Sequence, residues 1–509
     1  MNQHTLYAST TPPPSARPWD VGVAEEALCE LLKRLTNANI PLHALLISRH
    51  GKLIMEGYFA PYEKNTLHRM FSVCKTLNAL AIGLLEAEGK LSLADRIIDY
   101  FPDKVPETIH PFIQSMTIRD LLMMRTCHSS TTYKYDTEAE WVESFFTAHP
   151  THKPGTVFRY DTSSAHVLCC LVQRLSGQTM LDYLKDRVLR KIGWSEESYV
   201  LLNSFGDLQG GSGLMCTPMD LLLLGQLLLQ NGKWNKEQLL PKNFVKTAIS
   251  HLSATTMTGP STHELPGYGY QIWRGEQDNF VLYGLGGQFV ICFPRYQLVC
   301  VTNADTQNMA GIHRVLFDCI YDTLLPAIDL FEQGKYPMPL MEGGYTAYDR
   351  LQDYLKSLHI KAVCEETHCL HPQDTCQADI INNTYSFSKN EWNYKDICLS
   401  FDETNESGCL TYTYQNHFCQ LYFGTKQCQK GIFPVYNMVY YGSGGWISPN
   451  TFFIKCHLAD TSVGSIRIEL CFTDRDIHVF LHKVEETMFQ EYLGELYGSL
   501  PDQKMPMSK

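Results

Sequence analysis

The hydrophobic pattern of this chain changes between residues 335 and 380, and this change restricts the folds open to it more than any other feature. Before the change, apolar residues recur at helical spacing in several segments. After it, apolar and polar residues alternate over short stretches rich in Tyr, Phe, Thr and Ile. A period near 3.6 places side chains on one face of a helix, whereas a period of 2 places them on one face of a strand. The sequence therefore predicts a mixed unit followed by an all-β unit.

The length of the chain agrees with more than one unit, because 509 residues are about three times the ~150 residues expected for one domain. We expect an α+β fold in which helices flank an antiparallel sheet, followed by an all-β, lipocalin-like domain. The expected parts are a flexible N-terminal arm, the α+β domain, a helix with a linker, the β-barrel-like domain and a tail, over residues 1–18, 19–335, 336–379, 380–500 and 501–509.

Local patterns predict individual elements in both units. A helix begins at Thr217, where Thr-Pro-x-Asp supplies a cap, a proline in the first turn and an acid at the third position. In the first unit we also expect a helix over 20–37, a hairpin over 44–58, a helix over 72–88 and paired strands over 288–294 and 297–303. Further on we expect a helix over 345–358 and strands over 409–414, 418–423, 452–457, 465–472 and 476–482.

Charge and composition exclude several classes of partner. The formal net charge is −12, from 42 basic and 54 acidic residues, and no Lys/Arg block stands out, so we expect no nucleic-acid partner. No apolar run reaches the roughly 18 residues of a membrane span, and the N-terminus lacks the pattern of a secretory signal. We therefore expect a cytoplasmic protein that acts on a small molecule and whose 18 cysteines are reduced thiols. The oligomeric state stays open.

Ser72 and Lys75 form the sharpest chemical pattern, at the start of the helix predicted over 72–88. Spacing i, i+3 places the two side chains on one helix face. A serine hydroxyl becomes a nucleophile when a base removes its proton, and a neutral lysine is such a base. Burial and the positive end of the helix dipole both favour the neutral amine. The N–H of Ser72 at the helix start could also help to hold an oxyanion.

Tyr160 is the second candidate, just before a helix predicted over 165–175. A phenol held near Lys75 could exchange a proton with Ser72 and with a leaving group. Asp161 beside it is expected to cap the helix, with tuning of the tyrosine proton or substrate binding as the alternative.

Taken together, these patterns resemble the serine β-lactamase-related, penicillin-recognising hydrolase family. Its members include class C β-lactamases, D-aminopeptidases, family VIII esterases and 6-aminohexanoate-dimer hydrolases. The resemblance spans about residues 40–305, with the motifs in family order and 88 residues (160 − 72) between Ser72 and Tyr160. The matching stretches are 48–52, 72–75, 89–95, 116–122, 154–160, 210–214, 267–273 and 286–288.

The resemblance implies an acyl-enzyme mechanism with no cofactor and no metal. Ser72 attacks a carbonyl group, Lys75 and Tyr160 move its proton, and water then releases the acyl group. The oxyanion would sit between the N–H of Ser72 and an N–H on the strand after residues 284–287. The residues implied in substrate or oxyanion binding are Thr162, Tyr283, Gly286, Gly287 and Gln288.

The chain departs from the family pattern at two motifs. Thr162 stands where the family has an asparagine, and the strand motif over 279–288 contains neither Lys nor His. The cation with which the family holds a substrate carboxylate is therefore not evident in this motif. Arg274 and Arg295 are the candidates to replace it. Both departures favour an ester or amide that is recognised without a free carboxylate, and they argue against efficient β-lactam hydrolysis.

Three alternatives to this hydrolase stay open. The altered motifs fit a catalytically weak penicillin-binding or sensor module, which binds without turnover. The all-β domain fits a scaffold that supplies the function by itself. A β-lactamase or D-aminopeptidase activity is the third alternative, within the same family.

Several weaker candidates are expected to have structural roles. Cys74 is expected to pack on the far side of its helix, and His128 is a candidate for a pocket wall. A cluster in the linker contains zinc-ligand types, but its spacing matches no standard zinc motif, and we expect reduced thiols in a polar linker. The cluster consists of Cys364, His368, Cys369, His371 and Cys376.

Overall fold

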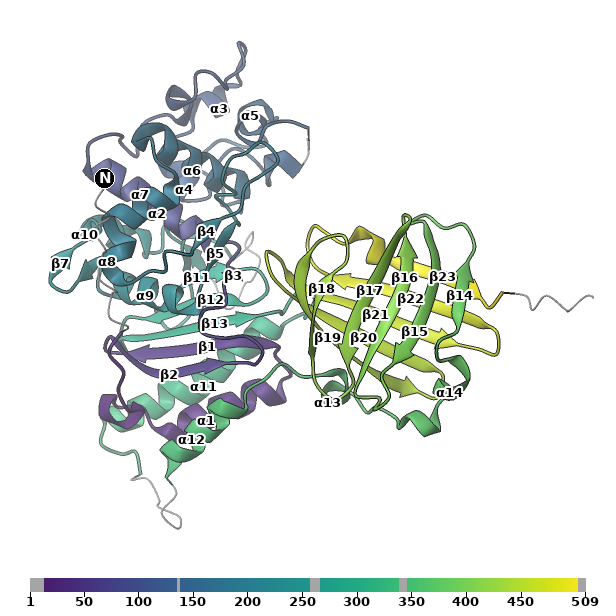
Figure 1. Cartoon of the computed structure of the whole chain (residues 1–509). Coiled ribbons are helices and arrows are strands. Elements are labelled where there is room, and N and C mark those ends of the chain that lie inside the picture. The colour runs from purple at the N-terminus through teal and green to yellow at the C-terminus, as the bar shows by residue number, and fades with distance from the viewer. Residues whose placement is uncertain (1–12, 135–137, 257–265, 338–345, 502–509) are drawn as a thin grey trace, which may run out of the picture. The chain divides into compact units, whose positions relative to one another are not determined.

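The computed structural model describes residues 13–134, 138–256, 266–337 and 346–501. The chain divides into two units, Met1–Leu358 and His359–Lys509. This boundary falls inside the segment 336–379 that was expected to hold a helix and a linker. The helix α12 (Ala347–Ser357) packs in the first unit, and the second unit begins at His359 (Figure 1). The start of the helix predicted over 345–358 lies outside the described residues.

An eight-stranded antiparallel sheet forms the centre of the first unit, with the order β2-β1-β13-β12-β11-β10-β9-β8. The predicted hairpin is confirmed, and its turn contains His50 and Gly51 at positive φ. Because β1 pairs with β13, segments from opposite ends of the unit lie together at its centre. The strands are β1 (Leu42–Arg49), β2 (Lys52–Tyr58), β8 (Ser253–Ala254), β9 (Gly267–Tyr268), β10 (Trp273–Arg274), β11 (Phe280–Gly284), β12 (Gln288–Phe293) and β13 (Leu298–Ala304).

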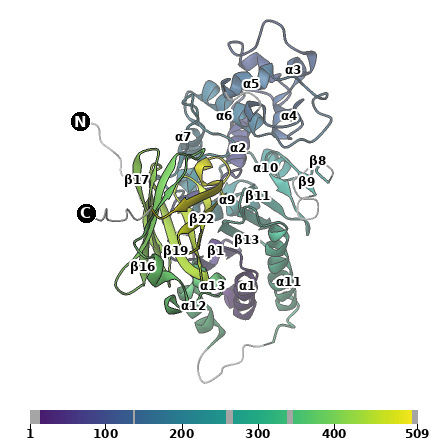
Figure 2. The ribbon, with the colours of Figure 1, turned by 90° about the vertical axis from the view of Figure 1, so that its right-hand side faces the viewer.

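Helices cover both faces of this sheet. On one face, α1 (Glu25–Asn37) and α11 (Ile312–Glu332) run side by side, and α12 packs against α1 and β2 (Figure 1 and Figure 2). On the other face, α9 (Pro218–Leu229) packs against β1, β12 and β13. Thr217 and Asp220 form the expected capping box at the start of α9, and its predicted beginning is confirmed. The helix is apolar all round, so it needs this buried position.

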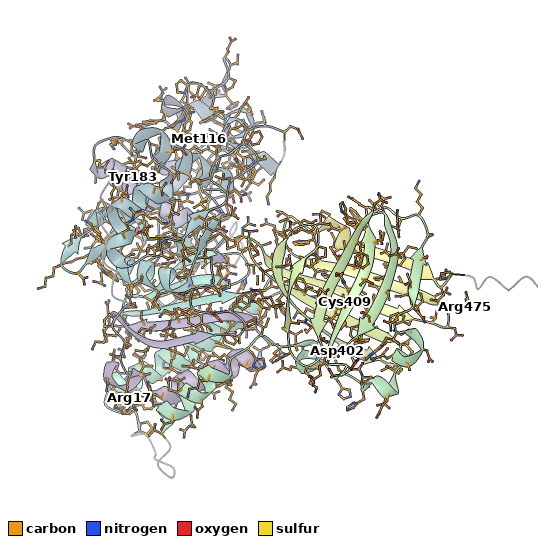
Figure 3. The ribbon with its side chains drawn as sticks, in the orientation of Figure 1. Arg17, Met116, Tyr183, Asp402, Cys409 and Arg475 are labelled. Carbon is orange, nitrogen blue, oxygen red and sulfur yellow. The ribbon has the colours of Figure 1, made fainter. Side chains whose placement is uncertain are left out.

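A helical layer stands beyond α9 and contains the segments with the predicted catalytic residues. Its centre is α2 (Cys74–Ala87), which packs against α6 (Thr162–Ser176), α7 and α10. The remaining helices are α3 (Pro111–Ser115), α4 (Ile118–Leu122), α5 (Trp141–Thr147), α7 (Met180–Leu184), α8 (Arg190–Ile192) and α10 (Lys242–Ala248). Short pairings link β3 (His68–Arg69) and β4 (Tyr199–Val200) to β5 (Leu214–Cys216), and β6 (Lys233–Trp234) to β7 (Glu237–Gln238). Met116 and Tyr183 mark this layer in Figure 3.

Part of the N-terminal arm, expected to be flexible over residues 1–18, makes backbone hydrogen bonds to β2. Leu53 N–H donates to the Pro14 carbonyl at 2.9 Å and Ala16 N–H donates to the Leu53 carbonyl at 3.0 Å. Proline favours an extended backbone and is tolerated at a sheet edge, because its missing N–H is not required for pairing there. The part of the arm before residue 13 lies outside the described residues.

The second unit is a closed barrel of antiparallel neighbours in the order β17-β16-β15-β14-β23-β22-β21-β20-β19-β18. A short parallel pairing of β17 with β19 closes it. The five strands predicted from alternation are confirmed, and Cys409 lies on one of them, β16 (Figure 3). The strands are β14 (Thr384–Phe387), β15 (Tyr394–Phe401), β16 (Ser407–Tyr414), β17 (His417–Gly424), β18 (Gln429–Phe433), β19 (Met438–Ser448), β20 (Thr451–Ala459), β21 (Val463–Phe472), β22 (Asp476–Val484) and β23 (Gly494–Ser499).

Two short helices, α13 (Val363–Glu366) and α14 (Gln377–Ile380), precede the barrel strands. Inward-facing aromatic and aliphatic side chains from the strands form a core of their own, as alternation predicts. In the described parts of both units, no helix combines the length and the apolar character needed to span a membrane.

Candidate active site

Ser72 lies in the turn before α2 and not in the helix itself, which begins at Cys74. The predicted start at residue 72 was therefore two residues early. Phe71 has a φ of 45°, and Lys75 N–H donates to the Ser72 carbonyl at 3.1 Å, so a tight turn of 3₁₀ type leads into the helix. The i, i+3 relation between Ser72 and Lys75 is kept in this turn. The Ser72 side chain is half-buried.

Lys75 is buried, with 1% of its surface exposed, and its amine is held at two points. Nζ donates to Ser72 Oγ at 2.9 Å and to the Gly211 carbonyl at 2.6 Å. The position at the start of α2 adds the positive end of a helix dipole. A lysine amine directed at a serine hydroxyl in this way is arranged to exchange a proton with it.

The loop that contains Gly211 was a matching stretch in the sequence, but its contact with the lysine was not foreseen. A Cβ atom on Gly211 would lie 2.2 Å from Thr162 Cγ2 and 3.5 Å from Lys75 Nζ. Asn78, one turn after Lys75, donates to the Gly210 carbonyl at 2.7 Å and to the Ala165 carbonyl at 3.0 Å. The loop is thus clamped between α2 and α6, which places the carbonyl that accepts from Lys75.

Tyr160 lies beside this pair, as the sequence order suggested. Its ring centroid is 5.0 Å from Lys75 Nζ. The ring stacks on Trp273 at 5.5 Å between centroids and meets Tyr268 edge-on at 6.4 Å. The three predicted catalytic side chains therefore come together from two segments, the turn before α2 and the loop before α6. The aromatic wall behind Tyr160 comes from β9 and β10, which the sequence did not connect to it.

The helix after Tyr160 begins at Thr162, three residues before the predicted start at Ala165. The reason is the N-cap: Asp161 Oδ1 accepts from Ser163 N–H at 2.8 Å. Thr162 therefore lies in the first turn of α6, with its methyl group toward Gly211. Thr162 N–H donates to Thr131 Oγ1 at 3.1 Å.

The third motif forms the β11–β12 hairpin, in which Gly284 pairs with Gln288. This register was not resolved in the sequence. A Cβ on Gly284 would lie 2.3 Å from the Met70 carbonyl oxygen, so the end of β11 lies against the chain that leads to Ser72. Gly286 and Gly287 form the turn at φ 77° and 94°, a region that glycine adopts without strain. The end of the third-motif strand thus lies against Met70, two residues before Ser72 in the chain.

Gln288 and Tyr283 lie on either side of that turn, in different surroundings. Gln288 is fully buried, and its amide donates to the carbonyls of Leu285 at 3.2 Å and Ala304 at 2.6 Å. It is thus placed to hold the turn. Tyr283 is half-buried, and its hydroxyl hydrogen-bonds with His313 Nδ1 at 2.7 Å.

His313, at the start of α11, had no signal in the sequence. Its Nε2 hydrogen-bonds with Thr306 Oγ1 at 2.7 Å, and Thr306 N–H donates to the Gly286 carbonyl at 3.0 Å. Burial lowers the pKa of His313 to about 4, so the ring is neutral and bridges a donor and an acceptor at neutral pH. The third-motif turn is thus tied to α11 through Tyr283, His313 and Thr306.

The two arginines considered as substitutes for a carboxylate-binding cation are engaged elsewhere. Arg274 donates to the Ile249 carbonyl at 3.0 Å and pairs with Asp278. Arg295, in the β12–β13 turn, pairs with Asp329 of α11 at 3.0 Å. Neither contact directs the guanidinium toward Ser72.

Asp161 is fully buried beside Lys75, and its second carboxylate oxygen has no hydrogen-bond partner among the described residues. Burial raises the pKa of Asp161 from its usual value near 3.8 to about 6, although Ser163, Ser164 and the Lys75 charge act in the opposite direction. Asp161 therefore combines the cap role expected from the sequence with a titration close to Lys75.

We predict that stability depends on pH through Asp161. Because the pKa is raised in the folded state, the contribution is complete below pH 4 and is lost as pH rises through 6. A shift of about 2 units corresponds to about 3 kcal/mol. Asp161→Asn keeps the cap and removes the titration. The difference in unfolding free energy between wild type and variant should therefore fall by about 3 kcal/mol between about pH 4 and 7. Urea unfolding of both proteins across this range measures it, and a constant difference would contradict the assignment.

The remaining candidates have structural surroundings. Cys74 is fully buried, and burial raises the pKa of its thiol to about 12. His128 is 2% exposed and contacts Phe145 edge-on, so it is a core residue and not a pocket wall. The cluster from Cys364 to Cys376 lies around α13 and α14, and no three of its side chains gather closely enough to share an ion within the part of the chain that the structure describes.

A second prediction concerns the contact between Gly211 and Thr162. Gly211→Ala places a methyl group against Thr162 Cγ2 and moves the carbonyl that holds Lys75. We expect a loss of about 10²-fold in kcat, the scale of a misplaced catalytic group. Thr162→Ser removes that same Cγ2 atom, so the double variant should recover at least about tenfold of the loss. Steady-state rates of the four proteins measure the coupling, and independent, multiplicative losses would show that the contact does not place Lys75.

Comparison with known proteins points to one family. A family model described as Beta-lactamase matches residues 30–315. The 6-aminohexanoate-dimer hydrolase of Paenarthrobacter ureafaciens is 22% identical over 298 residues, which cover 53% of this chain and 75% of that protein. Protein flp of Staphylococcus aureus is 22% identical over 312 residues, which cover 54% of this chain and 61% of that relative, so less than two thirds of its length is spanned.

A solved structure is also similar to this chain. It is a Bacillus anthracis protein whose name assigns it to the 6-aminohexanoate-dimer hydrolases, with a TM-score of 0.52 and 23% identity. The match covers 65% of this chain and 90% of that chain. At this level of identity the likeness shows the fold, a helix-flanked antiparallel sheet of the β-lactamase type.

Proposed function

We propose, from the premise that this chain belongs to the Beta-lactamase family, that it is a serine hydrolase which cleaves an ester or an amide through an acyl-enzyme on Ser72. One observation carries this proposal: Lys75 Nζ donates to Ser72 Oγ at 2.9 Å from a buried position. A serine hydroxyl that only caps a turn does not require a buried amine at its oxygen, whereas a nucleophile requires a base there.

In the proposed acylation, Lys75 as a neutral amine accepts the Ser72 proton while Oγ attacks the substrate carbonyl carbon. The carbonyl oxygen becomes an oxyanion, for which the N–H of Ser72 and an N–H of the Gly286–Gln288 turn are the proposed donors. The proton passes from Lys75 through the Tyr160 hydroxyl to the leaving group, and the bond to that group breaks. Tyr160 is proposed for this step because its ring is a neighbour of the amine, with 5.0 Å between Lys75 Nζ and the ring centroid.

In the proposed second half, water takes the place of the leaving group. It loses a proton to the same pair, attacks the acyl carbon, and releases the acid while the proton returns to Ser72 Oγ. Thr162 and Tyr283, from two sides of the site, are the proposed substrate contacts. Thr162 lies in the first turn of α6, and Tyr283 is a half-buried residue next to the end of β11.

The proposed substrate does not need a free carboxylate next to the reacting carbonyl. The third motif contains no cation, and the two arginines weighed as substitutes, Arg274 and Arg295, are paired with Asp278 and Asp329. Two similar proteins are named as 6-aminohexanoate-dimer hydrolases, so linear amides belong in the substrate panel beside esters. Efficient hydrolysis of carboxylated β-lactams is not expected.

A substrate panel with active-site capture tests the function. Purified protein is assayed on p-nitrophenyl esters, the linear 6-aminohexanoate dimer, D-amino acid amides and nitrocefin, and is labelled with a fluorophosphonate and with a fluorescent penicillin. We expect turnover of an ester or linear amide and a fluorophosphonate adduct that intact-mass and peptide analysis places on Ser72. A permanent penicillin adduct without turnover would instead support the binding or sensor module. Absence of any label or turnover would favour a scaffold.

We further propose a cytoplasmic or other reducing environment. The structure has all 18 cysteines as free thiols, which is the usual state where glutathione and thioredoxin act. A small molecule stays the proposed partner, and no cofactor is required by the steps above. Counting free thiols in protein purified with and without reductant checks this proposal.

A further inference from the structure

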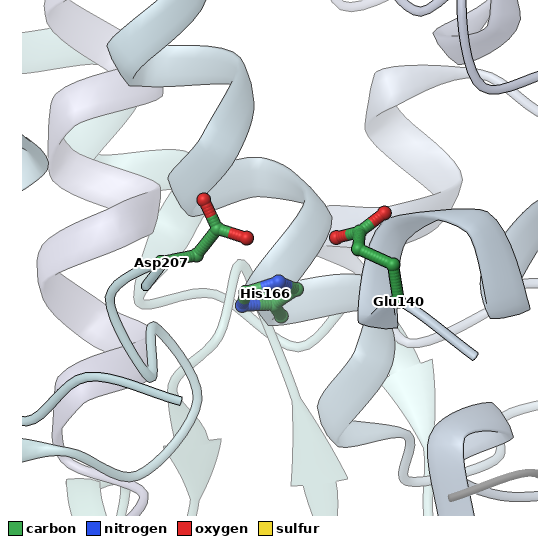
Figure 4. A group of neighbouring side chains, drawn as sticks. All are labelled: Glu140, His166 and Asp207. Carbon is green, nitrogen blue, oxygen red and sulfur yellow. The ribbon is translucent and has the colours of Figure 1, made fainter. Parts of the chain in front are cut away.

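We propose that Glu140, His166 and Asp207 form a binding site for a divalent transition metal, zinc in the first place, next to the loop that holds Lys75. One potential ligand atom from each of these side chains lies within 4.8 Å of the other two. Figure 4 shows the two carboxylates on either side of the imidazole ring. The sequence suggested no metal here, because the three residues come from segments far apart in the chain.

His166 is the centre of the proposed site. It lies on α6, is fully buried, and its Nδ1 lies 3.1 Å from the Leu208 carbonyl oxygen. A carbonyl only accepts, so Nδ1 holds the proton and Nε2 keeps its lone pair. Burial lowers the pKa of His166, which also favours the neutral ring. A histidine whose other ring N–H is held by a backbone carbonyl is the usual form of a metal ligand.

The two carboxylates are fixed in position but remain accessible from solvent. Glu140 is the N-cap of α5, accepts from Val142 N–H and Glu143 N–H at 3.0 Å each, and pairs with Lys104 at 3.1 Å. These contacts lower the pKa of Glu140, so it is a charged ligand with lone pairs left over. Asp207 is half-buried. Its backbone N–H donates to Asn203 Oδ1 at 2.9 Å, which closes the turn over 203–207.

The distances suit a small ion after modest movement. Ligand atoms on one tetrahedral zinc ion lie about 3.4 Å apart, so closing the site from 4.8 Å needs side-chain shifts of about 1 Å. Two carboxylates and a neutral imidazole balance the charge of a divalent ion. Cys170, one turn after His166, has its Sγ 3.6 Å from Nε2 and is the nearest further donor. Imidazole and thiolate favour zinc over magnesium or calcium.

The proposed metal site adjoins the loop over 207–211, which contains the Gly211 carbonyl that accepts from Lys75. Leu208 accepts from His166, Gly210 accepts from Asn78, and Gly211 accepts from Lys75. An ion bound to Asp207 would therefore join one end of the 207–211 loop to α5 and α6 while the other end holds Lys75. We expect this ion to have a structural role, stabilising the loop, because none of its three ligands contacts Ser72.

The test is metal binding by the full chain after removal of metals with a chelator. Zinc is added against a chromophoric chelator, and cobalt is added separately for its visible spectrum. Wild type should bind one equivalent at this site and become more stable to heat when zinc is present. Asp207→Asn, a half-buried and nearly isosteric change, should weaken zinc binding at least about tenfold and abolish the thermal shift. Cys170→Ala should alter the cobalt spectrum only if the thiolate is a ligand.

Matched variants separate this site from adventitious binding by thiols. Asp103→Asn removes an exposed carboxylate that pairs with Arg174, and Arg174 lies on α6, the helix that also contains His166. This variant should bind zinc as wild type does. Cys369→Ser removes a thiol from the cysteine-rich segment of the second unit and should have no effect either. The proposal is overturned if wild type binds less than about a tenth of an equivalent, or if Asp207→Asn binds as wild type does. It is overturned equally if the binding is lost in Cys369→Ser. These readouts do not depend on hydrolysis.

Discussion

Ser72→Ala is expected to lower the rate on the best ester or amide substrate by about 10⁴-fold or more, the scale on which removal of a nucleophile acts. The hydroxyl is half-buried at a turn and makes no large contribution to the core, so the melting temperature should stay close to that of wild type. Fluorophosphonate labelling and the corresponding mass adduct should be lost together with activity. Rates, labelling and thermal unfolding on the same preparation measure all three.

Ser176→Ala is the matched control for this change. Ser176 is another half-buried serine, at the end of α6, and its Oγ donates to the Val172 carbonyl at 2.7 Å. It should keep full activity and full labelling. If Ser72→Ala retained about a tenth of the activity or more, far above the residual rate expected without a nucleophile, Ser72 would not be the nucleophile. If the label moved to another residue, the assignment would fail in the same way.

Lys75→Met is expected to lower kcat by about 10³-fold, within the range of a lost general base. Stability should change little or even increase, because an apolar side chain of similar volume replaces a buried amine. The unpaired carbonyl of Gly211 and the nearby charge of Asp161 act against that gain. Kinetics and urea unfolding of the variant measure the two effects separately. A parallel loss of activity and stability would mean that Lys75 only supports the fold.

Lys185→Met controls for the removal of a buried lysine. Lys185 is 6% exposed, and its Nζ also donates to two carbonyls, those of Glu196 and Ser198, at 2.8 Å each. It differs from Lys75 in having no serine hydroxyl as partner. This variant should retain activity whatever its effect on stability. Equal loss of activity in both lysine variants would contradict the special role of Lys75.

Features set by a few neighbouring residues were predicted well from the sequence. The i, i+3 relation of Ser72 and Lys75, the capping box at Thr217 and the hairpin at Gly51 each depend on contacts within about four residues. The starts of α2 and α6 were misplaced by two and three residues. In both cases a turn or cap competed with the helical pattern, which periodicity alone does not resolve.

The support around the site was not predictable in the same way. Gly211 holds Lys75 across 136 positions of sequence, and the ring of Tyr160, in the loop before α6, stacks on Trp273 of β10. His313 lies on a helix that gave no chemical signal, yet it ties the third-motif turn to α11. A glycine carbonyl, a buried indole and a lone histidine are common in any chain, and only their distances give them a role.

The sequence by itself determined the two kinds of unit, the family resemblance and the order of the motifs, because periodicity and short motifs are properties of neighbouring residues. The tertiary structure decided the register of the β11–β12 hairpin, the anchoring of Lys75 and the meeting of Glu140, His166 and Asp207. Each of these depends on packing between segments that are distant in the sequence. In the hairpin, a shift of one residue would turn every side chain of the strand to the other face.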